Sequence, residues 1–540
     1  MYLNCHTYYS LRYGILSIEE LLEQASSNGI KTVALTDINN TMGIPEFIKK
    51  ANQNGIKPIA GCEFRNSDQL LFIAIAKNRE GLREINEFIT DHNIEKRDYP
   101  ILAPRFNNVE VVYPFGSIKC NELQKNQWIG IRPEQVNRLL ASEYEKHLDK
   151  LVILQPVCFK DESNWFLHKA LRAVDHNILF SRLTENQYAK KSERFFPESR
   201  IEKAFERYPE IINNTNKLIE SCSIEMDFAS IKNKKVFTQT PEDDKKLLKK
   251  LAFEGMEYRY GSNNEEAIKR IEHELVIIDK LGFSSYFLIT WDIIRYSMSC
   301  GFYHVGRGSG ANSIVAYCLR ITNVDPIKLN LYFERFLNPR RTSPPDFDID
   351  FSWKDRDQVQ EYIFKKYGKQ HTALLGATST FKDRSIYREL GKVFGLPKSE
   401  IDILVRSPES DTVKNDITML ICTLAKQIVD FPNQRTIHAG GVLISEEPIT
   451  YYTALDLPPK GFPTTQWDMY LAEELGFEKL DILSQRGIGH IKECVDIVLQ
   501  SREIKIDIHQ IEAFCNDEKV KSQIRRGETI GCFYIESPGM

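Results

Sequence analysis

Three aspartates alternate with apolar residues in one segment of the chain, Pro345-Asp346-Phe347-Asp348-Ile349-Asp350-Phe351. A β-strand repeats every two residues, so the alternation predicts a strand with Asp346, Asp348 and Asp350 on one face and apolar residues on the other. Neighbouring carboxylates repel one another, and divalent cations relieve that repulsion. Two acids on one strand and a third from elsewhere can hold the paired metal ions of an in-line phosphoryl transfer. A solvated edge strand is the simpler alternative, but the apolar face needs a core.

A glycine- and serine-rich turn lies upstream of these acids. Gly306-Arg307-Gly308-Ser309-Gly310-Ala311-Asn312-Ser313 is followed by the apolar run 314–319, which predicts a buried helix. Small residues let a ligand approach the backbone, and a turn that opens a helix offers free N–H groups to phosphates. The turn is not a P-loop, because no Gly-Lys-Ser/Thr follows, and it lacks the third glycine of a dinucleotide fingerprint. Such turns are common alone, but together with the acidic strand this one predicts the palm of a nucleotidyltransferase.

A third acid of the same kind lies in Phe477-Glu478-Lys479-Leu480-Asp481-Ile482-Leu483, which also alternates. In a strand, Lys479 and Asp481 face one way and the apolar residues face the other. Taken alone, the segment is better explained as an ordinary strand with a surface Lys–Asp pair. With the two motifs above, Asp481 becomes the expected third metal-binding acid, and Lys479 can neutralise a phosphate beside it.

The motifs occur in the order seen in bacterial DNA polymerase III alpha subunits, the C-family DNA polymerases, which the chain resembles over essentially all 540 residues. The segments that carry this resemblance are Gly306–Ser313, Val324-Asp325-Pro326, Phe333-Glu334-Arg335-Phe336-Leu337-Asn338-Pro339, Pro345–Phe351, His438-Ala439-Gly440-Gly441 and Lys479-Leu480-Asp481. The resemblance implies an α/β multidomain fold. A PHP-type α/β barrel (polymerase and histidinol phosphatase) is followed by a polymerase-beta-like nucleotidyltransferase palm with a helical thumb.

The implied activity is that of a DNA-directed DNA polymerase, which adds dNTPs to a primer 3′ end by two-metal phosphoryl transfer in replication or error-prone repair. The acids that the resemblance makes catalytic, and ligands of two Mg²⁺ ions, are Asp348, Asp350 and Asp481. The residues that it places on the incoming triphosphate are Arg307, Gly308, Ser309 and Lys479. Asp346 is expected to orient the other acids. Implied partners are primer-template DNA, dNTPs and, in a complete protein, a sliding clamp and other holoenzyme subunits, with no membrane.

The N-terminal region is similar to the PHP domain of that family, but most of its metal ligands are replaced. The opening His-x-His is Asn4-Cys5-His6, the Thr-Asp-His-Gly turn is Thr36-Asp37-Ile38-Asn39, and Gly61-Cys62-Glu63 is kept. The site residues that remain are His6, Asp37 and Glu63. Multi-metal sites need many ligands at once, so we expect a degenerate site without metal and without phosphoesterase activity.

The motifs also set the expected domain boundaries. These are a PHP-like domain at 1–225, a linker and the first part of the palm at 226–370, a thumb-like helical insert at 371–435, the second part of the palm at 436–490, and the start of the fingers at 491–540. Because the last ten residues match a motif just inside the fingers, we expect an N-terminal fragment that polymerises little by itself. Asn312 and Pro344-Pro345 favour the error-prone branch.

Local elements of this N-terminal region can be predicted as well. Ser17-Ile18-Glu19-Glu20 is a capping box that opens a helix. Thr32–Leu35 and Leu71–Ile75 are short apolar runs that predict buried strands. Further along, Ile268, Ile271, Leu275 and Ile278 share one face of a helix that leads into the palm.

Composition bounds the function classes. The apolar fraction of 42% and charged fraction of 27% are globular, and a net charge of −4 excludes a globally basic nucleic-acid binder. DNA contacts would therefore depend on local basic clusters, which are Arg340-Arg341, Lys365-Lys366 with Lys369, Lys382 with Arg384 and Arg388, and Arg525-Arg526. Eleven cysteines without a Cys-x-x-Cys pair favour reduced thiols and a cytoplasmic location. Three functions stay open: the polymerase, a PHP-type phosphoesterase, and a non-catalytic DNA- or partner-binding fragment.

Overall fold

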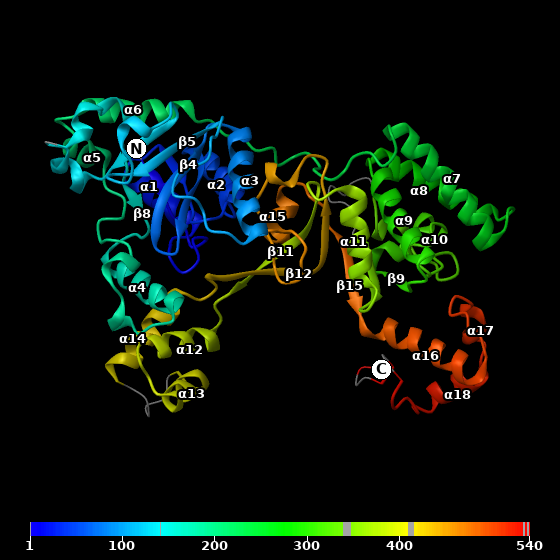
Figure 1. The fold of residues 1–540 in the computed structure, drawn as a ribbon. Helices are drawn as coiled ribbons and strands as arrows, with labels where there is room; N and C mark the ends of the chain where they lie inside the picture. The colour runs from blue at the N-terminus through cyan, green and yellow to red at the C-terminus, as the bar shows by residue number, and fades with distance from the viewer. Residues whose placement is uncertain are drawn as a thin grey trace. The chain divides into compact units, whose positions relative to one another are not determined.

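The computed structural model describes residues 2–140, 142–338, 347–408, 415–532, 535–536 and 539. Its elements form two compact units that interleave along the chain (Figure 1). The first unit comprises Met1–Lys232, Ala373–His438 and Glu447–Phe477; the second comprises Asn233–Thr372, Ala439–Glu446 and Glu478–Met540. Some features interpreted above lie partly or wholly outside the described residues, namely Pro339, Arg340-Arg341, Pro344-Pro345, Asp346 and part of the last ten residues.

The first unit is built on a curled, half-barrel sheet with the strand order β7-β6-β5-β4-β3-β2-β1-β8. Its strands are β1 Tyr2–Cys5, β2 Thr32–Leu35, β3 Lys57–Asn66, β4 Gln69–Ala76, β5 Val109–Pro114, β6 Gln127–Ile131, β7 Leu151–Ile153 and β8 Pro156–Val157. Neighbours pair in parallel except β3–β4 and β4–β5, which are antiparallel. Both ends of the sheet are two- or three-residue strands, so the expected barrel is an open curl among the described strands.

Helices cover this sheet and form a separate bundle in the same unit. The helices that follow the strands are α1 Ile18–Ser27, α2 Ile44–Gln53, α3 Arg79–Glu95, α4 Glu162–His176, α5 Glu198–Ala204 and α6 Pro209–Ser221. The later elements are β11 Thr372–Thr380, α12 Asp383–Val393, α13 Lys398–Arg406, α14 Asp416–Gln427, β13 Leu455–Asp456, β14 Thr464–Thr465 and α15 Met469–Glu474. The helices α12 to α14 provide the helical insert that the sequence predicts after the acidic strand.

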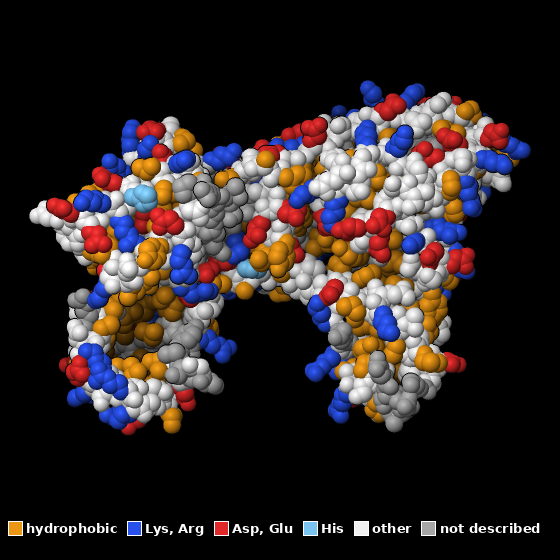
Figure 2. Space-filling view, turned by 180° about the vertical axis from the view of Figure 1, so that it is seen from behind, with side chains coloured by type: hydrophobic (Ala, Val, Ile, Leu, Met, Phe, Trp, Pro, Cys, Tyr) orange, Lys and Arg blue, Asp and Glu red, His pale blue; other side chains and the backbone are white. Residues whose placement is uncertain are grey.

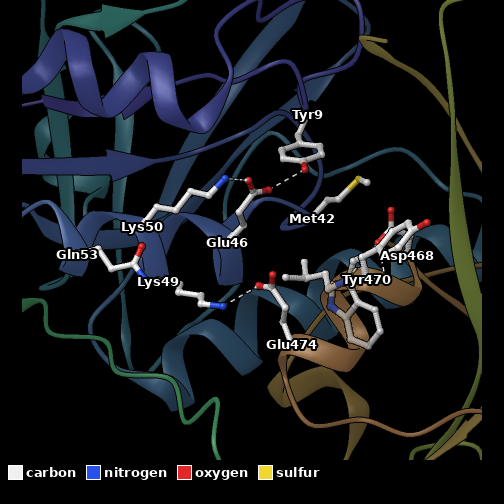
Figure 3. A pocket seen from close by; sticks show the side chains of 11 residues that line it. Tyr9, Met42, Glu46, Lys49, Lys50, Gln53, Asp468, Tyr470 and Glu474 are labelled. Atoms are coloured by element: carbon white, nitrogen blue, oxygen red, sulfur yellow. Dashed lines mark hydrogen bonds and ion pairs between the residues drawn. The ribbon is translucent and has the colours of Figure 1, made fainter. Parts of the chain in front are cut away.

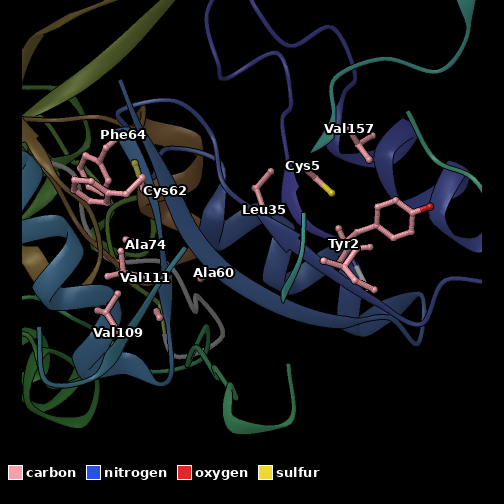
Figure 4. Packing of buried hydrophobic residues seen from close by; sticks show 14 of the residues in the cluster. Tyr2, Cys5, Leu35, Ala60, Cys62, Phe64, Ala74, Val109, Val111 and Val157 are labelled. Atoms are coloured by element: carbon pink, nitrogen blue, oxygen red, sulfur yellow. The ribbon is translucent and has the colours of Figure 1, made fainter. Parts of the chain in front are cut away.

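The core of the first unit confirms the local predictions. Ser17 caps α1 and Glu20 completes the capping box, and the strand expected at Thr32–Leu35 has those bounds. Figure 4 shows side chains from several strands packed together, among them Tyr2 and Phe64. Both are fully buried, which is how this face of the sheet gains its stability.

The second unit contains the acidic strand. Its elements are α7 Pro241–Tyr260, α8 Glu265–Lys280, α9 Ser284–Ser299, β9 His304–Arg307, the 3₁₀ helix η7 Gly308–Asn312, α10 Ile314–Cys318, the 3₁₀ helix η8 Phe333–Arg335, β10 Asp348–Ser352, α11 Arg356–Tyr367, β15 Leu480–Gln485, α16 Arg486–Arg502, α17 Ile511–Cys515 and α18 Glu518–Arg525. Strand β12, Pro432–Ile444, contributes its last residues. Within this unit β10 pairs with β15 in parallel and with β9 in antiparallel fashion, and Gly441 and Val442 of β12 pair with β15.

The apolar face of β10 is packed in a core. Phe347, Ile349 and Phe351 are at most 2% exposed. The Phe347 ring stacks on Tyr286 with centroids 5.5 Å apart and meets Phe287 edge-on at 5.1 Å. With a paired strand on each side, β10 is an interior strand, and the solvated-edge alternative is excluded. In the described residues no helix has the length and apolar character required to cross a bilayer.

Candidate functional site

Strand pairing brings the predicted palm residues of the second unit onto one face. Asp348 lies directly opposite Asp481 on β15 and opposite Arg307 on β9. Residues opposite each other in neighbouring strands point to the same side of a sheet, and residues two apart along one strand do likewise. Asp350 therefore joins Asp348, and Lys479 joins Asp481. Three segments far apart in sequence supply five charged side chains to one surface.

Arg307 joins the two carboxylates of β10. Its Nη1 donates to Asp348 Oδ2 at 2.9 Å and its Nε donates to Asp350 Oδ2 at 3.0 Å. The guanidinium is half exposed, whereas Asp350 is only 6% exposed. On β15, Lys479 Nζ forms an ion pair with Asp481 Oδ2, and Asp481 is 5% exposed. Two cationic side chains thus partly neutralise three aspartates, which reduces the repulsion that the sequence predicts.

The donor set fits a hard divalent cation. Carboxylate oxygens are the ligands that Mg²⁺ prefers, and Asp350 Oδ1 is a buried oxygen that accepts no hydrogen bond within the described part of the chain. Among the described residues no three acidic, histidine or cysteine side chains converge as a formed metal-ligand set. The side chains of Arg307 and Lys479 explain this arrangement, because each of them pairs with carboxylate oxygens that a metal ion would need.

The glycine-rich turn brings its backbone up to the same carboxylates. Gly308 has φ +74°, and a Cβ there would lie 3.0 Å from Asp348 Oδ2, so both conformation and space favour glycine. Ser309, on the same 3₁₀ helix, accepts a hydrogen bond at its carbonyl from Asn312 Nδ2 at 2.8 Å. The two predicted residues are therefore placed differently: Gly308 lies beside Asp348, and Ser309 lies in the body of the turn.

One interpretation of this turn is wrong. The N-terminus of α10 does not offer free N–H groups, because the carboxylate of Glu274 on α8 accepts from Ile314 N at 3.0 Å and from Val315 N at 3.1 Å. Ser313 Oγ also donates to Glu274, at 2.7 Å, and accepts from Ala316 N. Within this segment, the N–H groups of residues 314–316 are therefore not available to a phosphate.

Sequence reasoning missed Glu274, although a signal was present. Glu274 lies three residues after Ile271 and four before Ile278, within the apolar stripe that predicts α8. A carboxylate in an apolar stripe needs buried partners. Glu274 is 0% exposed, and burial raises its pKa to about 7 against the lowering effect of the three hydrogen bonds. Glu274 therefore joins α8 to the start of α10 through buried hydrogen bonds.

The N-terminal site residues also lie together, in the first unit, and the oxygens of their two carboxylates already accept hydrogen bonds. Asp37 accepts hydrogen bonds from Thr7 N and Thr7 Oγ1, both at 2.7 Å, and from Ser10 Oγ at 2.6 Å. Glu63 accepts from Asn4 Nδ2 at 2.7 Å and forms an ion pair with Arg65. These contacts form a hydrogen-bonded core cluster of residues from β1, from β3 and from the segments that follow β1 and β2.

The electrostatics of this cluster depend on Arg65. Burial by itself would raise the pKa of Glu63, but the Arg65 guanidinium and His6 hold that pKa well below its usual range. His6 Nε2 lies 3.3 Å from Glu63 Oε2. Burial raises the pKa of Asp37, against its hydrogen bonds from Ser10 and Thr7. A guanidinium thus supplies the positive charge that a metal ion supplies in a metal-binding site of this kind.

A pocket of about 420 Å³ in the first unit lies between α2 and α15 (Figure 3). Lys49 Nζ lies 3.2 Å from Glu474 Oε2, and Glu46 accepts from Tyr9 at 2.8 Å and pairs with Lys50. Two ion pairs, Lys49–Glu474 and Lys50–Glu46, thus lie at this pocket, and none of the sequence-predicted site residues lines it. The predicted palm residues lie elsewhere, on or directly beside β9, β10 and β15.

Comparison with known proteins agrees with this geometry. Residues 246–484 match the bacterial DNA polymerase III alpha NTPase domain, and residues 3–256 match the PHP domain. An error-prone DNA polymerase from Symbiobacterium thermophilum is 29% identical over 100% of this chain and 55% of its own length. DNA polymerase III subunit alpha from Ureaplasma parvum is 29% identical over the same shares, and that from Bacillus subtilis is 33% identical over 64% of this chain and 32% of its own length.

The fold is thus a PHP domain followed by a polymerase alpha NTPase domain. The chain belongs to the family of bacterial DNA polymerase III alpha subunits, whose curated members that match it from end to end include an error-prone polymerase. The resemblance predicted from the motifs is confirmed. The chain spans about half the length of the curated relatives that it matches over its whole length.

Proposed function

We propose that this chain supplies the catalytic palm of a DNA-directed DNA polymerase. The observation that carries the proposal is the register of β9, β10 and β15, which sets Arg307, Asp348 and Asp481 side by side with Asp350 on the same face. Matches to the NTPase domain of polymerase III alpha support it. The reaction is attack of a primer 3′-hydroxyl on the α-phosphate of a dNTP, and pyrophosphate is the leaving group. The substrates are primer-template DNA and dNTPs, in the cytoplasm.

The proposed roles follow from charge and position. Asp348, Asp350 and Asp481 would hold two Mg²⁺ ions, which supply charge neutralisation and Lewis acidity at the reacting phosphate. Arg307 and Lys479 neutralise these carboxylates and, in the proposal, transfer their hydrogen bonds to the phosphates of the nucleotide. The turn at Gly308 and Ser309 brings main-chain groups up to the same phosphates. Positioning and electrostatics therefore do most of the catalytic work.

The N-terminal unit has a different proposed role. Its carboxylates are engaged by Arg65 and by neighbouring hydroxyl and amide groups, which supports a structural remnant without phosphoesterase activity. The expected domain boundaries, the sliding clamp and the other holoenzyme partners stay part of the same proposal. So does the assignment to the error-prone branch.

The test is primer extension by the protein in the form that its source cell makes, after the mass of that form has been measured. We expect Asp348→Asn, Asp350→Asn and Asp481→Asn each to lower the extension rate by about a thousandfold or more, with DNA binding retained, because each removes a group needed in the transition state. Asp357→Asn, an exposed acid on α11, is the matched control and should extend normally. Near-normal extension by any of the three palm variants would contradict the proposed roles.

A further inference from the structure

Glu274 is a buried carboxylate that serves one segment of the molecule. Both of its oxygens are used: Oε1 accepts from Ile314 N, and Oε2 accepts from Ser313 Oγ and Val315 N, all within 3.1 Å. These donors come from three consecutive residues directly after η7. Glu274 has no exposed surface and forms no ion pair with any residue that the structure describes. Such a carboxylate is costly to bury, and these hydrogen bonds offset part of that cost.

The segment held by Glu274 is the one that carries the proposed nucleotide contacts. The 3₁₀ helix Gly308–Asn312 runs directly from Arg307 into Ser313, so fixing Ser313 fixes one end of the turn. The other end is fixed by β9, which pairs with β10. Within the turn, Gly310 lies against Phe347, where a Cβ would approach the ring to 2.7 Å. The turn is therefore clamped between α8 on one side and the catalytic strand on the other.

We propose that Glu274 is a positioning residue for nucleotide binding: by holding residues 313–315 against α8, it keeps the 308–312 turn in the conformation that meets the triphosphate. The inference rests on the proposed polymerase function and adds to it a residue that touches neither substrate nor metal. Both carboxylate oxygens are needed, because each faces a backbone N–H. An amide can present an acceptor to only one of those two groups, and its NH₂ would face the other donor.

The experiment compares the native protein with Glu274→Gln and with Glu272→Gln, an exposed glutamate on the same helix that makes the same change in charge. Amide hydrogen exchange is followed over residues 308–318, and KM for a dNTP and kcat are measured by primer extension. We expect Glu274→Gln to speed exchange in that segment and to raise KM about tenfold, with a smaller change in kcat. Glu272→Gln should change neither quantity.

The outcomes are separable. Unchanged KM and unchanged local exchange in Glu274→Gln overturn the inference and leave the polymerase proposal standing. If the wild-type protein extends no primer at all, the polymerase proposal is overturned, and the inference falls with it. If Glu274→Gln does not fold, Ser313→Ala decides, because it removes one of the three hydrogen bonds to the carboxylate. An unchanged KM in that variant contradicts the inference, and a raised KM with kcat retained supports it.

Discussion

Arg307 occupies oxygens of two carboxylates that a metal ion would need. It bridges Asp348 and Asp350, and Asp350 is nearly buried. We expect Arg307→Gln to lower stability by about 1 kcal/mol in EDTA, a modest cost because the guanidinium is half exposed. Mg²⁺ should then raise the melting temperature of the variant more than that of the wild type. In the variant, the metal ion no longer competes with a guanidinium for the carboxylate oxygens.

The matched control is Arg295→Gln. Arg295 is also a largely exposed arginine of the second unit that pairs with a buried aspartate, Asp292, at 2.8 Å. Asp292 also accepts hydrogen bonds from Tyr362 and Tyr367, so losing Arg295 creates no place for a cation. Thermal shifts with and without Mg²⁺ check both variants. Equal Mg²⁺ responses in wild type and Arg307→Gln would show that the β10 carboxylates are not a cation site.

Helices and strands could be predicted from the sequence where apolar residues repeat with one spacing along a whole segment. The alternation around Asp348 and Asp350 gave the strand and its buried face, and the stripe through Ile268 and Leu275 gave α8. The capping box at Ser17 gave the start of α1. Each of these signals is local, because side-chain spacing along a strand or helix needs no partner to be read.

Elements that depend on distant partners were not predictable. The alternation around Asp481 predicts a strand, but nothing in it says that this residue lies opposite Asp348 rather than Asp350. The turn before α10 predicts free N–H groups, but their acceptor, Glu274, lies 40 residues earlier in the chain, and no local pattern links the two. The role of Arg65 was not predictable for a similar reason. Its pairing with Glu63 is a local (i, i+2) contact, but the buried cluster around that pair also needs residues from β1 and from the segment after β2.

Glu63 and Arg65 of β3 form a buried ion pair, and His6, which follows β1, lies next to Glu63. We expect Arg65→Gln to destabilise the protein by about 3–5 kcal/mol near neutral pH, because it leaves Glu63 buried and charged without its guanidinium. In the wild type, the lowered pKa of Glu63 gives stability that is present above the unfolded pKa and is lost as the pH falls.

In the variant we expect the pH dependence to reverse. Burial raises the pKa of Glu63 and Arg65 lowers it most, ahead of His6 and Asn4, so removal of Arg65 should raise that pKa. The stability of the variant should then decline as the pH rises through the raised pKa. The difference in melting temperature between wild type and Arg65→Gln should therefore be large at about pH 7.5 and smaller at about pH 5. Lys50→Gln, whose ion pairs lie on exposed helix surface, serves as control and should show little change at either pH. A pH-independent difference for Arg65→Gln would exclude Glu63 as the titrating group.

On the scale of the whole molecule, net charge does not attract DNA. The chain carries a formal charge of −4, and Figure 2 shows basic and acidic side chains interspersed over the face in view. Binding to a polyanion must then come from local groups. On α12, Arg384 and Arg388 are exposed one turn apart, while Ile386 and Leu390 on the opposite face are buried. That amphipathic helix is a compact basic surface on the helical insert.

We therefore predict that the double substitution Arg384→Glu and Arg388→Glu weakens binding of a primer-template duplex about tenfold at moderate salt. It should also reduce the slope of log K against log salt concentration by about 2, because two phosphate contacts release their counterions in the wild type only. Lys119→Glu with Lys125→Glu makes the same change in net charge at two exposed positions of the first unit. Fluorescence anisotropy over a salt series measures both double variants. Equal weakening by the two pairs would mean that net charge governs DNA binding, and a loss confined to the α12 pair would place duplex contacts on the helical insert.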